Sequence, residues 1–249
     1  GLLRRNQQAN HFTYSNAVVN LPLVLKDSSV LVFGPGIEKW DIKSAALQSV
    51  PSVLKGLSVQ LAFIKPLAHN WTATFLFLPR WNGSETYSFK NKLLPAGAVL
   101  ASRKLSADFT YKFGVYYHNE YYGNIFIPLF GLDWKINPTL SLFGILPGSL
   151  TLEKKVTPAF YYGAAFRALT ASYEYADSKN FIRIDENQLQ AFADVYLAKH
   201  VVLNAEVGHS VLRRFRTGNI HGSPKYELTD KFQDNMLLRV GLAYRVRFD

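Results

Sequence analysis

The sequence lacks cysteine, so the chain holds neither a disulfide framework nor a thiolate metal site. Charged residues make up only 18% of it, against about 25% in typical soluble domains. Apolar runs are short as well. The stretch 125–132 is among the longest, contains Pro128 and falls far below the roughly 18 residues of a spanning helix. These absences exclude a disulfide-stapled mini-domain and a helical membrane protein.

Aromatic residues are frequent, at 14%, and the clearest pattern that includes them is the C-terminal stretch 237–248. Every second residue there is apolar, namely Leu238, Val240, Leu242, Tyr244, Val246 and Phe248. The residues between them are mostly small or cationic. Side chains alternate across a strand, so the pattern predicts one strand with an apolar face opposite a cationic face. Its length suits the ~9–11 residues with which a tilted strand crosses a membrane.

The same period of two recurs in thirteen segments from residue 11 onward, and no long stretch has the period of a helix. Short turns lie near Lys26, Pro66, Lys104, Pro138, Pro158 and Lys199. Longer polar links lie near 41–53, 80–94, 176–187 and 217–233. Short periplasmic turns and longer extracellular loops are typical of outer-membrane barrels. We therefore predict one all-β domain over residues 1–249, a transmembrane antiparallel up-and-down β-barrel.

The strand count adds a further expectation about the start of the chain. Thirteen is odd, and bacterial barrels prefer even numbers of strands. The first segment, from about Phe12, ends in a short turn, so it would start on the outer side, whereas barrel termini normally lie in the periplasm. We therefore expect an ascending strand at or before residues 1–9 and about fourteen strands in total, with twelve as the alternative.

The alternation also assigns charged side chains to the barrel interior. The residues expected to line the lumen are Asp108, Lys112, Asp133, Lys135, Asp194, Glu206, Arg239, Arg245 and Arg247. The arginines among them have Glu206, Asp194 and Asp108 as expected partners. Two interpretations stay open. The charges form a mutually neutralising network, since buried charges need partners, or they line a pore whose excess of cations favours anionic solutes.

Residues near the strand ends are candidates for contact with the membrane surface. Aromatic side chains collect at membrane–water interfaces, and those expected to do so here are Trp71, Tyr117, Tyr121, Trp134 and Phe248. Arg213 and Arg216 lie near an outer strand end and are candidates for contact with lipopolysaccharide phosphates. A solvated loop is the alternative for these two arginines.

The central stretches IPLFGLDWKIN (127–137) and LSLFGILP (140–147) resemble an uncharacterised outer-membrane β-barrel family of Bacteroidota-type bacteria. The segments NLPL (20–23) and RVGLAYR (239–245) resemble it too. The resemblance covers most of the chain and implies the fold and an outer-membrane location. The family carries no assigned activity, so the resemblance implies no site residues.

Patterns of catalytic or ligand-binding residues are lacking. His209 and Ser210 are neighbours on one strand and face opposite sides, so only a histidine of another strand, such as His118, could serve Ser210. The six histidines show no metal-ligand spacing. The net charge of +10 is spread singly along the chain, which argues against a nucleic-acid interface. We expect no enzyme activity, no cofactor, no metal and no nucleic-acid partner.

The expected location is the outer membrane of a Gram-negative cell, and the expected partners are its lipid and lipopolysaccharide. The leading hypothesis for function is a non-enzymatic, porin-like passive channel for small solutes. The alternative is a structural or accessory subunit of a larger outer-membrane complex, in contact with another outer-membrane protein. The sequence does not decide between the two.

Overall fold

Period-two alternation produces strands along nearly the whole chain. The computed structural model describes residues 11–43, 51–84, 92–175, 179–221, 226–231 and 236–244, and these contain no helix that could span a membrane. The strands are β1 (His11–Val18), β2 (Leu21–Val24), β3 (Val30–Lys43), β4 (Val53–Pro66), β5 (Trp71–Phe77), β6 (Arg80–Gly83), β7 (Leu93–Leu94), β8 (Ala96–Lys104), β9 (Phe109–Glu120), β10 (Gly123–Asn137), β11 (Leu140–Leu146), β12 (Ser149–Thr157), β13 (Phe160–Tyr175), β14 (Asn180–Tyr196), β15 (Val201–Asn219), β16 (Tyr226–Lys231) and β17 (Met236–Tyr244).

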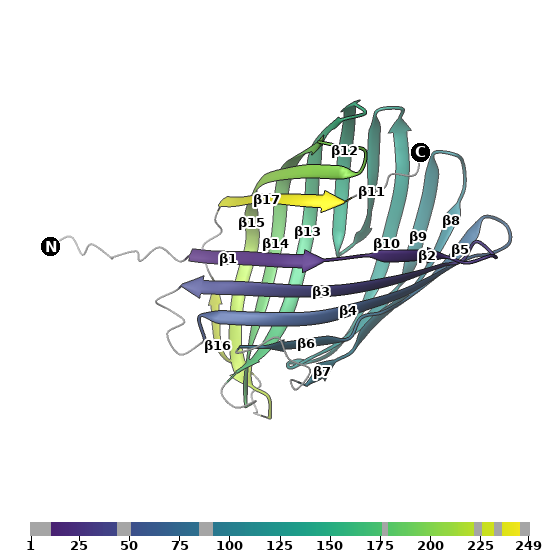
Figure 1. Ribbon diagram of the computed structural model, residues 1–249. Coiled ribbons are helices and arrows are strands. Elements are labelled where there is room, and N and C mark those ends of the chain that lie inside the picture. Colours follow the sequence, from purple (N-terminus) through teal and green to yellow (C-terminus); the bar gives the residue numbers. More distant parts are fainter. Residues whose placement is uncertain are drawn as a thin grey trace.

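The seventeen strands form one antiparallel meander (Figure 1). Some consecutive short strands lie end to end against the same neighbour, so the sheet is thirteen strand positions wide, and we call each position a lane. Four lanes each consist of two consecutive short strands: β1 with β2 beside β3, β5 with β6 beside β4, β7 with β8, and β16 with β17 beside β15. The lanes correspond one for one to the thirteen segments predicted from residue 11 onward. Three predicted links are shorter than expected, because β6 and β7, the start of β14, and β16 lie within them.

Six short turns gather at one end of the lanes, which we call the short-turn end, and all six were predicted. Each gets its shape from local contacts. Asn137 accepts a hydrogen bond from the Thr139 backbone N–H at 3.0 Å, as in an Asx turn. In the first turn, a hydrogen bond from Lys65 lowers the pKa of Asp27 to about 2. The connections after β3, β6, β13 and β15 lie at the opposite, long-loop end.

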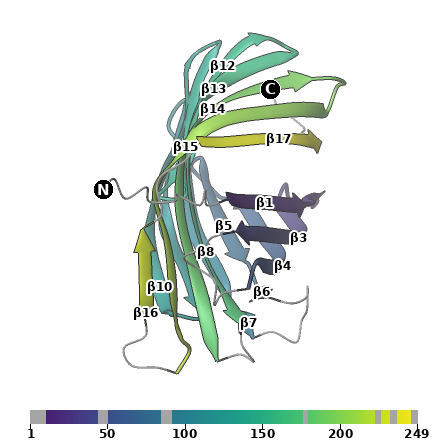
Figure 2. The same cartoon turned by 90° about the vertical axis from the view of Figure 1, so that its left-hand side faces the viewer.

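Nine of the strands, β4, β5, β6 and β8 to β13, close into a ring. All pairings around this ring are antiparallel except one parallel bridge between Glu174 of β13 and Gly83 of β6. The other strands extend the sheet beyond β4 and β13, so that β1 to β4 cross in front of β13 to β15 (Figures 1 and 2). The expected all-β barrel is therefore present.

The long-loop half of β13 leaves the wall and enters the interior. β12 pairs with β13 only as far as Arg167, whereas β14 pairs with β13 up to Tyr175. In this half both faces of β13 are buried: Ser172 on one side and Tyr173 on the other. One face packs against β3 and β4, and the other meets the end of β9. The long-loop halves of β13 and its neighbours β14 and β15 thus fill the barrel at this level.

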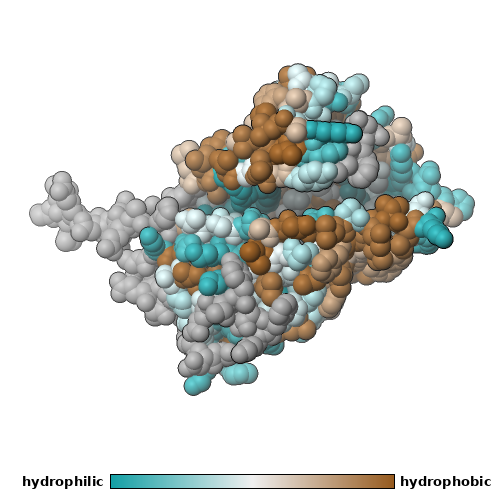
Figure 3. Space-filling view, in the orientation of Figure 1, coloured by the Kyte–Doolittle hydropathy of each residue, from teal (hydrophilic) through white to brown (hydrophobic). Residues whose placement is uncertain are grey.

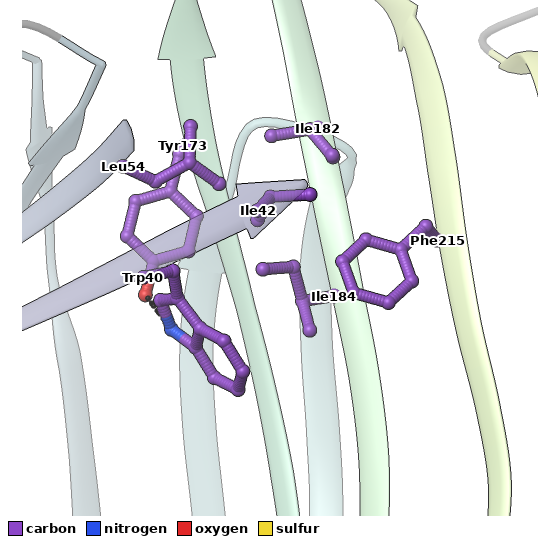
Figure 4. Packing of buried hydrophobic residues seen from close by; sticks show 7 residues of the cluster. All are labelled: Trp40, Ile42, Leu54, Tyr173, Ile182, Ile184 and Phe215. Carbon is purple, nitrogen blue, oxygen red and sulfur yellow. Dashed lines mark hydrogen bonds between the residues drawn. The ribbon is translucent and has the colours of Figure 1, made fainter. Parts of the chain in front are cut away.

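An apolar cluster forms on the β3–β4 side of this crossing (Figure 4). Its members come from five strands, at alternate positions where two of them share a strand, and are Trp40, Ile42, Leu54, Tyr173, Ile182, Ile184 and Phe215. Burying such large side chains is worth roughly 1.5–3 kcal/mol each. The cluster therefore stabilises the interior position of the β13–β15 ends and narrows the interior there.

The outer face of the sheet is apolar along many strands. On β17 the residues at even positions, Met236, Leu238, Val240, Leu242 and Tyr244, are 67–79% exposed, and those between them are half-buried. Similar exposed residues occur on β2, β3, β5, β9, β10, β14 and β15. Figure 3 shows broad apolar patches over β17 and β2. The outer face is therefore apolar on strands from both halves of the chain.

Close strand contact at Gly163 gives a test of the fold. A Cβ there would lie 2.0 Å from the Leu152 carbonyl oxygen, whereas a Cβ at Gly241 would meet nothing within 4 Å. We expect Gly163→Ala to lower the free energy of unfolding by about 1–3 kcal/mol, because overpacking displaces a backbone. Gly241→Ala serves as control and should be near neutral. Urea unfolding followed by tryptophan fluorescence measures both, and equal midpoints would contradict the close approach of β12 and β13.

Candidate functional site: the barrel interior

Two overlapping cavities open the interior toward the short-turn end. They measure about 710 and 850 Å³ and share Asp108, Lys135, Ser141 and Glu153. The first reaches up to Arg167 and Glu206, and the second reaches down to the turn at Asn137. We call the two cavities together the vestibule.

The vestibule is close to charge balance. Its cationic lining residues are Lys104, Lys135, Lys155 and Arg167, and its acidic ones are Asp108, Asp133, Glu153, Asp194 and Glu206. Among the described residues the acids thus outnumber the cations by one. The excess of cations considered for a pore lining is not found here, although the whole chain carries a net charge of +10.

The upper wall of the vestibule carries a bonded ionic network around Glu206. Arg167 donates to both carboxylate oxygens, at 3.0 and 2.9 Å. Arg239 donates one hydrogen bond to Glu206 at 2.8 Å and a second to Gln188 at 3.2 Å. Glu206 is only 3% exposed, so its charge needs these partners. Around Glu206 the charges thus form the mutually neutralising network, and Arg239–Glu206 is one of the arginine–acid contacts that the sequence left open.

The other predicted lumen residues lie lower in the interior. Asp108, Asp133, Lys135 and Asp194 line the first cavity. Lys112 forms an ion pair with Asp133 at 2.7 Å. The buried Asp194 accepts a hydrogen bond from Asn204 at 2.7 Å. Arg245 and Arg247 lie outside the described residues.

Above the vestibule, side chains from opposite sides of the barrel touch. Glu38 of β3 accepts hydrogen bonds from the hydroxyls of Tyr14 at 3.0 Å and Tyr173 at 2.5 Å. The indole N–H of Trp40 donates to the Tyr173 hydroxyl oxygen at 3.0 Å (Figure 4). We call these four residues the constriction. Because β13 does not pair with β1 or β3 in the sheet, this contact spans the interior.

A second polar cluster lies on the other face of β13. The buried Glu120 accepts hydrogen bonds from Arg80 and from the Ser172 hydroxyl and backbone N–H. The His118 ring Nδ1 lies 3.2 Å from the same carboxylate. Asn82 donates to the Ser172 carbonyl at 3.0 Å. No local pattern in the sequence predicts this cluster, since its members lie up to 92 positions apart.

This second cluster does not have the arrangement of a catalytic triad. In such a triad the histidine lies between the hydroxyl and the carboxylate and takes the hydroxyl proton. Here the Glu120 carboxylate lies between Ser172 and His118, and all three residues are buried. The pairing of His118 considered with Ser210 is not formed either, because His118 faces Glu120. The cluster fixes β13 to β6 and β9.

Arg213 corrects one surface prediction. It was expected to reach lipopolysaccharide, but it is buried, with two hydrogen bonds to Glu186 at 3.1 and 2.7 Å and its guanidinium 5.1 Å from the Phe12 ring centre. The cause is a β-bulge on β15: Leu212 has a φ of 57°, and the pairing with β14 shifts there. The bulge shifts the inward–outward alternation of the side chains by one residue, so that Arg213 points inward.

Arg216 is not a free surface cation either. Its guanidinium lies 3.6 Å from the Asp185 carboxylate and 5.5 Å from the ring centre of Tyr226, and it is half-buried. Neither arginine is therefore presented as the lipopolysaccharide contact that its position near a strand end suggested.

The predicted interface aromatics divide into two groups. Trp71 contacts Tyr111 and Phe113 edge-on at 5.9 Å, Trp134 is 43% exposed, and Tyr117 packs against Phe126 at 4.9 Å. These three lie on the wall, and their contact with a membrane surface stays a prediction. Phe248 lies outside the described residues.

Tyr121, by contrast, is only 2% exposed, and its prediction as an interface residue is wrong. The chain turns inward after β9, where the backbone N–H of Tyr121 donates to the Ser172 hydroxyl and its own hydroxyl donates to the Asn82 carbonyl, both at 3.1 Å. Tertiary contacts with β6 and β13 hold it inside.

Metal-binding groups are not evident: the described ranges contain no cluster of three or more His, Asp or Glu side chains that could hold an ion.

A family model described as "Domain of unknown function (DUF6268)" matches residues 36–245. The chain belongs to this family. No curated protein and no solved structure matches it. In this DUF6268 protein the matched range includes the vestibule walls and three of the four constriction residues, and it leaves β1 and β2 outside. The family description assigns no activity, so the roles of residues rest on geometry.

The Arg213–Glu186 pair gives a test of the interior. Removing a partner from a buried ion pair leaves an uncompensated charge, which costs about 3–5 kcal/mol. We expect Arg213→Ala to lower the free energy of urea unfolding by that amount. Arg216→Ala removes a half-buried pair of longer distance and should cost about 1 kcal/mol or less.

Combining Arg213→Ala with Glu186→Gln removes the unpaired charge and should recover part of the lost stability. If Arg213→Ala costs no more than Arg216→Ala, the inward position of Arg213 is wrong.

Proposed function

We propose that this chain is a β-barrel of the outer membrane of a Gram-negative bacterium of the Bacteroidota type, with its wall embedded in lipid. The observation that carries the proposal is the apolar outer face, which continues over described strands from β2 to β17, while the vestibule is lined by charged side chains. In lipid, strands need a closed wall, because unsatisfied backbone groups are costly there. We place fourteen strands in the complete wall, one more than the thirteen lanes described.

Within this barrel we propose passive passage of small solutes, without an enzymatic step. The vestibule supports this function, because it is lined by charged side chains, is large enough to hold many water molecules and opens toward the short-turn end. The constriction of Tyr14, Glu38, Trp40 and Tyr173 is then the narrowest point of the route. The near balance of charge in the vestibule favours weak selectivity between anions and cations.

The second candidate is a structural or accessory subunit of an outer-membrane complex. One observation favours it: both faces of β13 are buried at the level of the constriction, so the interior is filled there. A barrel whose interior stays filled at this level would act by binding other proteins of the complex with its outer surface. A conductance measurement in planar bilayers distinguishes the channel from the accessory subunit.

Lipid embedding is tested with three of the four tryptophans. In single-tryptophan variants reconstituted with brominated lipid, bromine quenches the fluorescence of rings that touch lipid. We expect strong quenching of Trp71 and Trp134, which lie on the outer wall, and little quenching of Trp40, which is 4% exposed inside the barrel. Equal quenching of Trp40 and Trp134 would contradict the assignment of the two faces.

The channel function is tested by widening the constriction. We expect the native protein to show small conductance in planar bilayers and Trp40→Ala to raise it several-fold, because the indole is removed from the narrowest level. Trp71→Ala, on the outer wall, is the matched control and should leave conductance unchanged. If both the native barrel and Trp40→Ala stay silent at all voltages, passive passage is wrong and the accessory function is favoured.

A further inference from the structure

A third cavity, of about 220 Å³, lies between β1, β3, β4 and β6 on one side and β13 and β14 on the other. All four constriction residues line it, together with Arg80 and Asn82 of β6. On β13, Arg167 lines the vestibule, and Leu169, the next residue on the same face, lines this cavity. The cavity is therefore the next space along β13 beyond the vestibule, and we call it the constriction cavity.

Glu38 is the one carboxylate that lines the constriction cavity within the described part of the chain. Both of its hydrogen-bond donors are neutral: the Tyr14 hydroxyl donates to Oε2 at 3.0 Å and the Tyr173 hydroxyl to Oε1 at 2.5 Å. A carboxylate offers about four lone-pair sites, so each oxygen keeps acceptor capacity. Arg80, the cation of the lining, donates to the buried Glu120 instead. The negative charge of Glu38 is thus held by hydroxyl groups and not by an ion pair.

Gly56 of β4, which pairs with Glu38 in the sheet, leaves space beside this carboxylate. A Cβ there would lie 2.7 Å from Glu38 Oε1 and 2.9 Å from Asn82 Oδ1. The side-chain amide nitrogen of Asn82 donates to the Ser172 carbonyl at 3.0 Å, so the amide oxygen beside Glu38 is an acceptor. Acceptor oxygens from β3 and β6 therefore converge on one part of the cavity wall, and a ligand there has to supply hydrogen-bond donors.

The rest of the lining is aromatic and aliphatic. The rings of Tyr14 and Trp40 lie 4.5 Å apart between their centres, and the Tyr173 hydroxyl meets the Trp40 indole nitrogen (Figure 4). Aliphatic side chains of the lining are Leu57, Leu78, Leu169, Ala171 and Ile184. Aromatic rings attract ammonium groups through their quadrupole, and aliphatic walls suit a hydrocarbon chain. Calcium or magnesium ions need about six or more oxygen ligands, and such a lining does not suit them.

We propose that the constriction cavity binds a small organic cation. Its primary ammonium group donates to Glu38 and Asn82, and its alkyl part lies against the rings and aliphatic side chains. A primary ammonium carries three N–H donors, which match the converging acceptors. Binding at this level adds a preference for cations that the nearly charge-balanced vestibule lacks. The site depends on the interior contacts alone and goes beyond the proposed passage of solutes.

Titration of the full-length protein in detergent tests the proposal. A variant that keeps Trp40 as its single tryptophan reports on the cavity, because this indole lines it. At constant ionic strength we expect n-butylammonium to change the Trp40 fluorescence in a saturable way. Butan-1-ol and butyrate have the same chain length without a positive charge, and over the same concentration range they should cause no saturable change. Calorimetric titration of the native protein gives a second, label-free measurement.

Two isosteric variants locate the binding. Glu38→Gln keeps the shape of the side chain and removes its charge, and we expect n-butylammonium to bind at least about tenfold more weakly, because a charge-assisted hydrogen bond is lost. Asp41→Asn, on the same strand, is the matched control. Asp41 faces the other side of β3 and pairs with Lys39 at 3.0 Å, so this variant should keep the native affinity.

Three results would overturn the site: no saturable binding of n-butylammonium, equal binding of butan-1-ol or butyrate, or native affinity in Glu38→Gln. The first two are measured on the native protein and decide the question even where Glu38→Gln fails to assemble. A barrel that is silent in planar bilayers and still binds n-butylammonium would refute solute passage and support the site.

Discussion

Burial of both faces of β13 at Ser172, Tyr173 and Glu174 is the constraint on which the interior depends. A wall strand has one face in the interior and one face outside, but here Ser172 and Tyr173 are both enclosed. Each face therefore needs its own partners. One finds the aromatic and apolar side chains of β3 and β4, and the other finds the carboxylate of Glu120 and the amide of Asn82.

This crossing separates two chemical regions. Toward the short-turn end, charged side chains of both signs line the vestibule. Toward the long-loop end, aromatic rings and bonded carboxylates fill the interior. The net charge of the chain does not predict the character of the vestibule, because acids such as Asp194 and Glu206 point inward and many cations lie elsewhere.

The sequence predicts the wall well because a wall strand obeys a local rule. Alternation of apolar and polar residues placed β17 correctly, and Glu206 was among the expected partners of its arginines, as the bond from Arg239 confirms. All six short turns were also predicted, since proline, asparagine and lysine–serine stretches interrupt the alternation at one end. These features need no knowledge of distant residues.

The sequence predicts the filled interior poorly because its causes are not periodic. One left-handed residue, Leu212, reverses the facing of Arg213. Tyr121 turns inward because of contacts with distant strands. The stretch 176–187 was expected to be a link, yet β14 begins within it at Asn180, and Glu186 faces the interior and accepts a hydrogen bond from Gln188. Only tertiary partners make such polar residues suitable for a strand.

The hydrogen bond between Trp40 and Tyr173 joins residues 133 positions apart, while the wall is built from hairpins between sequence neighbours. Closing a long loop costs more entropy than closing a short one, and local contacts form sooner than distant ones. The meander can therefore assemble hairpin by hairpin, whereas the crossing needs β3 and β13 to be in place beforehand. A polypeptide with this layout gains its wall early in folding and its filled centre late.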